Sequence, residues 1–64
     1  MRAKIKTALK HKYKGEIAEA TANVEVYLSN PAGIGEHPDI VGAIDTQMDR
    51  LAEEKNKLLA LEKH

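Results

Sequence analysis

The chain has 64 residues, with ten bases balanced by ten acids, two tyrosines as its only aromatic residues, and no cysteine. The absence of cysteine excludes disulfides, thiolate zinc sites and thiol catalysis, and the shortage of aromatic rings disfavours base stacking. We expect one domain, residues 1–64, that buries only about 60 % of its unfolded surface. Small folds need extra stabilisation, and self-association is the route best supported here.

The zero net charge hides a separation of charges along the chain. Residues 1–14 carry six bases and no acid, whereas residues 16–54 carry nine acids and the single base Arg50. No segment approaches the roughly 20 apolar residues of a membrane span. No apolar run follows the basic N-terminus, as it would in a secretory signal. We therefore expect a cytoplasmic protein without a membrane span.

Residues 3–28 predict a first helix. Steps of three and four residues separate its apolar positions, which favours one apolar stripe along a helix. The stripe consists of Ile5, Leu9, Tyr13, Ile17, Ala20, Val24 and Leu28. Gly15 is its weak point, because glycine costs about 1 kcal/mol relative to alanine inside a helix. A kink, or a separate N-terminal arm, would begin there.

Residues 29–37 predict the connection. Asn30 precedes Pro31, and a residue before proline is disfavoured in a helix. Gly33 and Gly35 can adopt positive φ angles. The isolated Gly-Ile-Gly is a poor match to a phosphate-binding loop, so we interpret these glycines as part of a turn.

Residues 38–62 predict a second helix, with Pro38 suited to the first helical position. Its apolar stripe is Val41, Ile44, Met48, Leu51, Lys55 and Leu58. This is heptad-like spacing. Lys55 interrupts the stripe, and its ammonium group either reaches out to water or fixes the register of the helices.

The predicted fold is all-α, an antiparallel two-helix hairpin that dimerises into a four-helix bundle. At 1.5 Å per residue both helices are roughly 37–39 Å long, and a short connection favours antiparallel packing. Two helices cannot enclose their own apolar stripes, so a dimer is the economical solution. The predicted core of the hairpin or dimer is Ile5, Leu9, Ile17, Val24, Leu28, Val41, Ile44, Met48, Leu51 and Leu58.

The basic N-terminal run is the sharpest candidate site, and it consists of Arg2, Lys4, Lys6, Lys10, Lys12 and Lys14. Positive charge near a helix N-terminus opposes the helix dipole, so these side chains do not stabilise their own helix. Two interpretations stay open. The bases either face acids of the same fold or dimer, such as Glu53, Glu54 and Glu62, or bind an external anion such as phosphate.

Catalysis is not expected. The three histidines are scattered, and no serine or threonine lies beside a histidine base. A two-helix hairpin should also lack a ligand pocket of the usual 300 Å³ or more. Glu36, His37 and Asp39 lie close together in the sequence, but three such neighbours rarely converge on one metal ion. A capping role suits His37 better. We predict no enzyme, no cofactor and no metal.

The segment from Val26 to Val41 reads VYLSNPAGIGEHPDIV. It resembles a segment in short proteins of unassigned activity from tailed bacteriophages, notably T4-like phages of marine cyanobacteria. The resemblance covers about a quarter of the chain, and the flanking helices agree only in character. It implies a phage-encoded protein made in the host cytoplasm, either a minor virion component or a modulator of a host protein. It implies no site residue.

The leading hypothesis is a non-enzymatic protein–protein interaction protein. A connection of fixed shape is a natural recognition surface, although it could equally serve only to lock the hairpin. The contact would use either this connection or the exposed side of the second helix, and the candidate contact residues are Ile34, Gly35, Glu36, His37 and Ile40. The alternative is a small nucleic-acid-associated protein that uses the basic run on phosphates.

Overall fold

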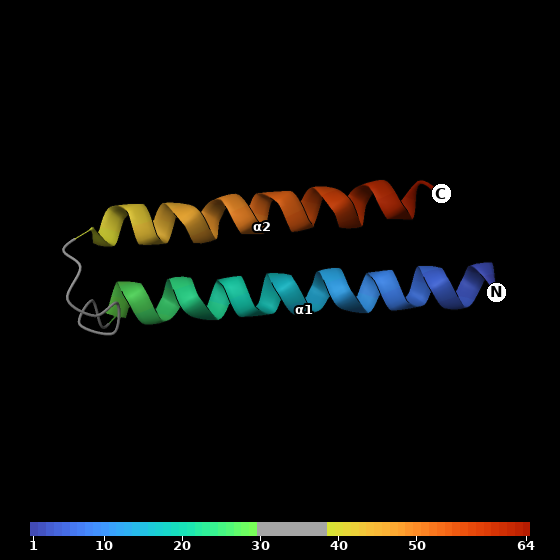
Figure 1. The fold of residues 1–64 in the computed structure, drawn as a ribbon, viewed down its shortest axis with the longest axis horizontal. Coiled ribbons are helices and arrows are strands. Elements are labelled where there is room, and N and C mark those ends of the chain that lie inside the picture. The colour runs from blue at the N-terminus through green and yellow to red at the C-terminus, as the bar shows by residue number, and fades with distance from the viewer. Residues whose placement is uncertain (30–38) are drawn as a thin grey trace.

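The computed structural model describes residues 1–29 and 39–64. These residues form two helices, α1 (Arg2–Ser29) and α2 (Ile40–Glu62), which pack against each other. The helices run antiparallel, with both termini at one end (Figure 1). The molecule measures 47 × 15 × 15 Å along its principal axes. The prediction of two packed helices is confirmed for the described residues, which contain no strand.

α1 is continuous from Arg2 to Ser29, so the helix passes through Gly15 without a break. At its last residue, the Ser29 hydroxyl donates a 2.7 Å hydrogen bond to the backbone carbonyl of Glu25. Such a bond to the preceding turn competes with continuation of the helix. Apart from Ser29, the predicted connection lies outside the described residues.

α2 begins at Ile40, two residues later than predicted. Asp39 is its N-cap, and the Asp39 carboxylate accepts a 2.8 Å hydrogen bond from the Gly42 N–H. An aspartate in this position satisfies one of the orphan N–H groups of the first turn. The sequence interpretation placed Pro38 at the first helical position and did not identify Asp39 as the cap. At the other end, the Lys63 N–H closes the last turn on the carbonyl of Ala60 at 3.2 Å.

The line along which the helices meet, here called the seam, has a heptad-like spacing on both helices. Among the buried and half-buried side chains, those at this spacing are Leu9, Tyr13, Glu16, Ala20, Asn23 and Tyr27 on α1, and Ile40, Ile44, Gln47, Leu51, Glu54, Leu58 and Leu61 on α2. Ala20 is fully buried, and Glu54 is 8 % exposed. Polar residues therefore occupy several positions between the helices.

The seam is rotated from the predicted apolar stripes. Of the ten predicted core residues, six are half-buried: Leu9, Ile17, Val24, Ile44, Leu51 and Leu58. The other four are exposed in the single hairpin: Ile5, Leu28, Val41 and Met48. The stripes were assigned from apolar side chains alone, whereas the helices also align polar groups that bond to one another.

Candidate functional site

Polar side chains pair across the seam in two layers. The amide of Asn23 donates to the Gln47 amide oxygen at 3.2 Å. One turn further from the connection, the Arg50 guanidinium donates to the carboxylate of Glu16 and lies 3.1 Å from that of Glu19. The pairing with Arg50 holds the pKa of the Glu16 carboxyl below its ordinary value, through the hydrogen bond first and the charge second.

A third polar contact forms nearer the termini. The Lys57 ammonium lies 3.3 Å from the Glu54 carboxylate and 3.6 Å from that of Glu53. It also lies 5.9 Å from the centre of the Tyr13 ring, within reach of a cation–π interaction. The hydrogen bond that the Lys57 ammonium donates to Glu54 is the largest cause of the raised pKa of Lys57. Through the described part of the chain, no buried side-chain nitrogen or oxygen lacks a hydrogen-bond partner.

Sequence reasoning missed these contacts. One signal was visible, since Arg50 is the only base between Glu16 and Glu54. A second was the spacing of seven residues between Glu16 and Asn23, and again between Gln47 and Glu54. Polar residues that repeat every seven positions on a helix share one face. Together these signals indicate a partly polar seam.

The Arg50–Glu19 ion pair marks one side of the hairpin, here called the ionic side. Nine residues are two and a half helical turns at roughly 3.6 residues per turn, so a residue nine positions away lies on the opposite side of its helix. Val41 and Leu59 are each nine residues from Arg50, and Leu28 is nine residues from Glu19. All three therefore lie on the side away from the ion pair.

This opposite side is the apolar face, and it consists of Ile17, Val24, Leu28, Val41, Met48 and Leu59. Both helices contribute to it. Val41 is 81 % exposed, Leu28 66 %, Leu59 59 % and Met48 50 %. An apolar surface built from two elements and left in water is typical of a site that binds another protein.

The six bases of the N-terminal run make no ion pair with the acids of residues 1–29 and 39–64, where the paired cations are Arg50 and Lys57. Arg2 instead donates to the carbonyl of His64 at the other terminus. No ion pair joins the run to Glu53, Glu54 or Glu62 within the described hairpin. Lys6 is half-buried, and the other five bases of the run are exposed.

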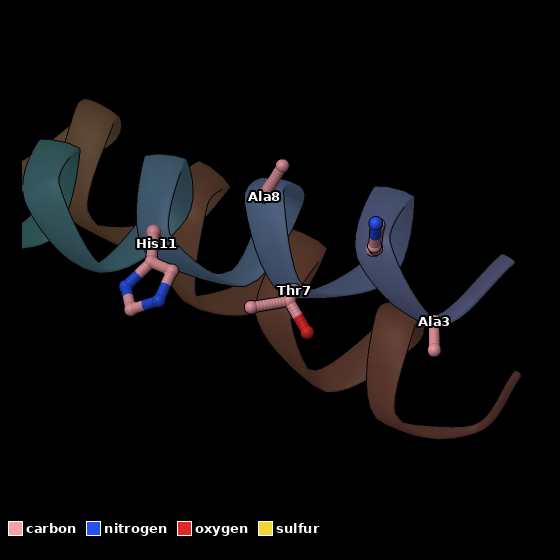
Figure 2. A pocket seen from close by; sticks show the side chains of 5 residues that line it. Ala3, Thr7, Ala8 and His11 are labelled. Atoms are coloured by element: carbon pink, nitrogen blue, oxygen red, sulfur yellow. The ribbon is translucent and has the colours of Figure 1, made fainter. Parts of the chain in front are cut away.

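Two open hollows lie near the termini, contrary to the expectation that the hairpin would lack pockets of 300 Å³. One, of ≈ 360 Å³, is lined by Ala3, Lys4, Thr7, Ala8 and His11. All its lining residues come from α1 alone, with α2 on the far side of the helix (Figure 2). A hollow against a single helix encloses little of a ligand.

The second hollow, of ≈ 400 Å³, lies between the two helix ends. Its lining is Arg2, Ile5, Lys6, Leu9, Leu61 and His64. The sequence interpretation did not expect a hollow of this size. It forms because the last seam residues, at the ends of the helices, have no further helical turn to cover them. The first hollow does place Thr7 and His11 on one stretch of α1, four residues apart, so the expectation that no threonine lies beside a histidine is wrong there.

Four of the five residues predicted at the connection, Ile34, Gly35, Glu36 and His37, lie outside the described residues. The fifth, Ile40, is half-buried at the start of α2 and contributes to the seam rather than to an exposed surface. In the two described ranges, no three histidine or acidic side chains converge to hold a metal ion. Neither α1 nor α2 is long and apolar enough to cross a membrane.

Comparison with protein-family models, with curated proteins and with solved structures finds no match to this chain.

Proposed function

We propose that this chain is a non-enzymatic protein-interaction module whose contact surface is the apolar face, and that it pairs with itself through this face to form a four-helix bundle. The observation that carries the proposal is the exposure of Val41, Leu28, Leu59 and Met48 on one side of the hairpin. In the same hairpin, Ala20 is the only fully buried apolar residue among those described. Several large apolar side chains are thus left exposed outside the seam.

The gain from covering these four side chains can be bounded. Full burial of a valine, leucine or methionine contributes about 1.5–3 kcal/mol, so the half that is still exposed contributes roughly 1 kcal/mol each. A symmetric pair covers these four side chains in each of its two copies, so the gross gain is roughly 8 kcal/mol. Association costs an estimated 4–15 kcal/mol. The gain and the cost are of similar size, so the proposal is of a weak, reversible dimer rather than an obligate one, and it is tested at high protein concentration.

Sedimentation equilibrium tests the pairing with two matched variants. Met48 is 50 % exposed on the apolar face. Val26 is 49 % exposed, and because it is seven residues from Glu19 it lies on the ionic side. Wild type and Val26→Glu should sediment at twice the monomer mass of 7.1 kDa. Met48→Glu should sediment as a monomer with its helix content retained. Equal masses for the two variants would overturn the proposal.

The biological role that we propose is binding to a host protein, as a phage-encoded modulator or a minor virion component in the bacterial cytoplasm. Its support is the resemblance of the Val26–Val41 segment, and the form that binds would be the dimer assembled through the apolar face. Wild type and Met48→Glu are used as bait in bacterial lysate, with nuclease and rising salt. A discrete protein retained by wild type and lost with Met48→Glu would support the role. Retention of the same proteins by both baits would refute it.

A second candidate function is nucleic-acid association. The observation that favours it is that the basic run makes no ion pair with the acids of the described residues 1–29 and 39–64. Binding to duplex DNA should then weaken with salt, with a log–log slope of about −0.9 for each phosphate contacted. The variant Lys10→Gln, Lys14→Gln should make this slope shallower. Binding to a protein partner should instead survive nuclease treatment.

A further inference from the structure

We infer that the partner covering the apolar face is a second copy of this chain in antiparallel orientation, so that each hairpin's closed end lies against the other's open end. The closed end is the one with Ser29 and Asp39, and the open end is the one with both termini (Figure 1). The inference rests on the proposed self-association and specifies its geometry. Charge complementarity along the hairpin carries it.

The two ends of the hairpin have opposite charge. At the open end, residues 1–14 carry six bases and no acid, and residues 52–64 carry three of each. At the closed end, the described residues 16–29 and 39–50 carry six acids and the single base Arg50. The open end is therefore strongly positive and the closed end strongly negative. Two such rods attract when they lie side by side in opposite directions.

The same polarity appears on the α1 part of the apolar face. Lys14 is fourteen residues from Leu28, an interval of about four turns, so both lie on the same side of α1. Glu25 is eleven residues beyond Lys14, about three turns, and also lies on this side. Lys14 is towards the open end and Glu25 towards the closed end, and both are exposed. A base and an acid thus border the same apolar strip.

The α2 part follows the same order. Asp45 lies between Val41 and Met48 in the sequence, towards the closed end, and Lys55 is seven residues beyond Met48, towards the open end. The bond from Asn23 to Gln47 fixes which residues of the two helices share a level. By that register, Glu25 lies level with Asp45.

A twofold axis that runs across the hairpin, at the level of Ala20 and Leu51, allows both the charged contacts and the apolar contacts to form. It stacks α1 on α1 and α2 on α2 of the second copy, each pair antiparallel. Lys14 and Glu25 lie six and five residues from Ala20, so each meets the opposite charge of the second copy. Val41 and Leu59 lie ten and eight residues from Leu51 on α2, so they meet each other.

The parallel alternative has its axis along the hairpin and stacks α1 on α2 of the second copy. This places Glu25 against Asp45 at the closed end and Lys14 close to Lys55 at the open end. Like charges facing each other oppose association. A side of 47 by 15 Å is comparable in size to the roughly 800 Å² that each partner buries in a stable interface. The antiparallel pair uses this side fully.

Disulfide trapping distinguishes the orientations, because the chain has no cysteine of its own. Three single variants are prepared: Val41→Cys, Leu28→Cys and Leu59→Cys. Two cysteines join only when their β-carbons approach to about 3.5–4.5 Å. In a thiol–disulfide buffer, Val41→Cys mixed with Leu59→Cys should give a cross-linked heterodimer on a non-reducing gel. Val41→Cys mixed with Leu28→Cys should give at least tenfold less. The reverse yields would overturn the antiparallel geometry.

Charge reversal provides a second readout. Lys14→Glu and Glu25→Lys should each weaken the dimer severalfold, and the double variant should restore it, because both contacts are then remade with exchanged signs. In the parallel geometry, Lys14→Glu would instead strengthen the dimer by removing its repulsion with Lys55. Raising the salt should weaken the antiparallel dimer and would strengthen a parallel one.

These outcomes separate the inference from the proposal beneath it. If wild type sediments as a monomer at every concentration, self-association fails and the orientation fails with it. If wild type is a dimer and the Val41–Leu28 cross-link dominates, self-association stands and only the antiparallel geometry is overturned.

Discussion

Replacement of Ala20 by leucine tests the closest approach of the two helices. Ala20 is fully buried at the seam, so the larger side chain has no free space between α1 and α2. Overpacking of this kind costs about 1–3 kcal/mol. Alanine and leucine have similar helix propensities, so the change reports packing rather than helix formation. A chain of this size has roughly 3–10 kcal/mol of total stability, so the loss should be a large fraction of it.

Thermal unfolding followed by circular dichroism measures the effect at one fixed protein concentration, because self-association would otherwise shift the midpoint. At about 4–8 °C per kcal/mol for a small domain, Ala20→Leu should lower Tm by at least roughly 4 °C. The control is Ala18→Leu, two residues earlier and exposed, which should stay within about 0.5 kcal/mol of wild type. Equal midpoints for both variants would refute close helix contact at Ala20.

Three further predictions concern local contacts. Gly15→Ala should stabilise the chain by about 1 kcal/mol in chemical denaturation, because an added β-carbon meets no atom within 4 Å. Gly42→Ala should be nearly neutral in the same assay. The added β-carbon would clash with the Asp39 carboxylate and displace the cap. The lost cap costs about 1 kcal/mol, which offsets the gain in helix propensity. In an Asp39→Ala background the same change should become stabilising, and a neutral result there would contradict the cap. The stability difference between wild type and Glu16→Gln should be constant above about pH 5 and should vanish as the pH falls through the lowered pKa of Glu16, because the contact with Arg50 needs the carboxylate. A difference independent of pH in thermal melts would refute that assignment.

The two helices were predictable from the sequence because their signals are local. Apolar spacing and the breakers around Pro31 placed α1 within one residue at each end, and α2 ended at Glu62 as predicted. The start of α2 was misplaced because two adjacent residues, Pro38 and Asp39, are each suited to a helix N-terminus. The hydrogen bond from Gly42 to the Asp39 side chain decides between them, and sequence alone does not show it.

The seam was harder to predict because it depends on both helices at once. Asn23 and Gln47, or Glu16 and Arg50, are poor core residues singly and become suitable only when the fold places each opposite its partner. A search for apolar residues at helical spacing therefore chose Val41 and Met48 and passed over the polar positions. For the same reason, the sequence did not separate the apolar face from the seam, since Leu28, Val41 and Met48 had been assigned to one common core of the hairpin or dimer.

A seam made partly of polar pairs has a consequence for assembly. Polar residues at core positions lower stability but fix register, because a shift along the helix would leave them buried without partners. Asn23 can reach Gln47 in one register only, and Arg50 then meets Glu16 in that same register. The hairpin thereby gains a defined alignment from contacts that contribute little net stability, and the side chains that could contribute more, Val41 and Leu28 among them, stay on one outer side. A fixed register is what allows those side chains to form a continuous face, since sliding one helix by a turn would separate the α1 part from the α2 part.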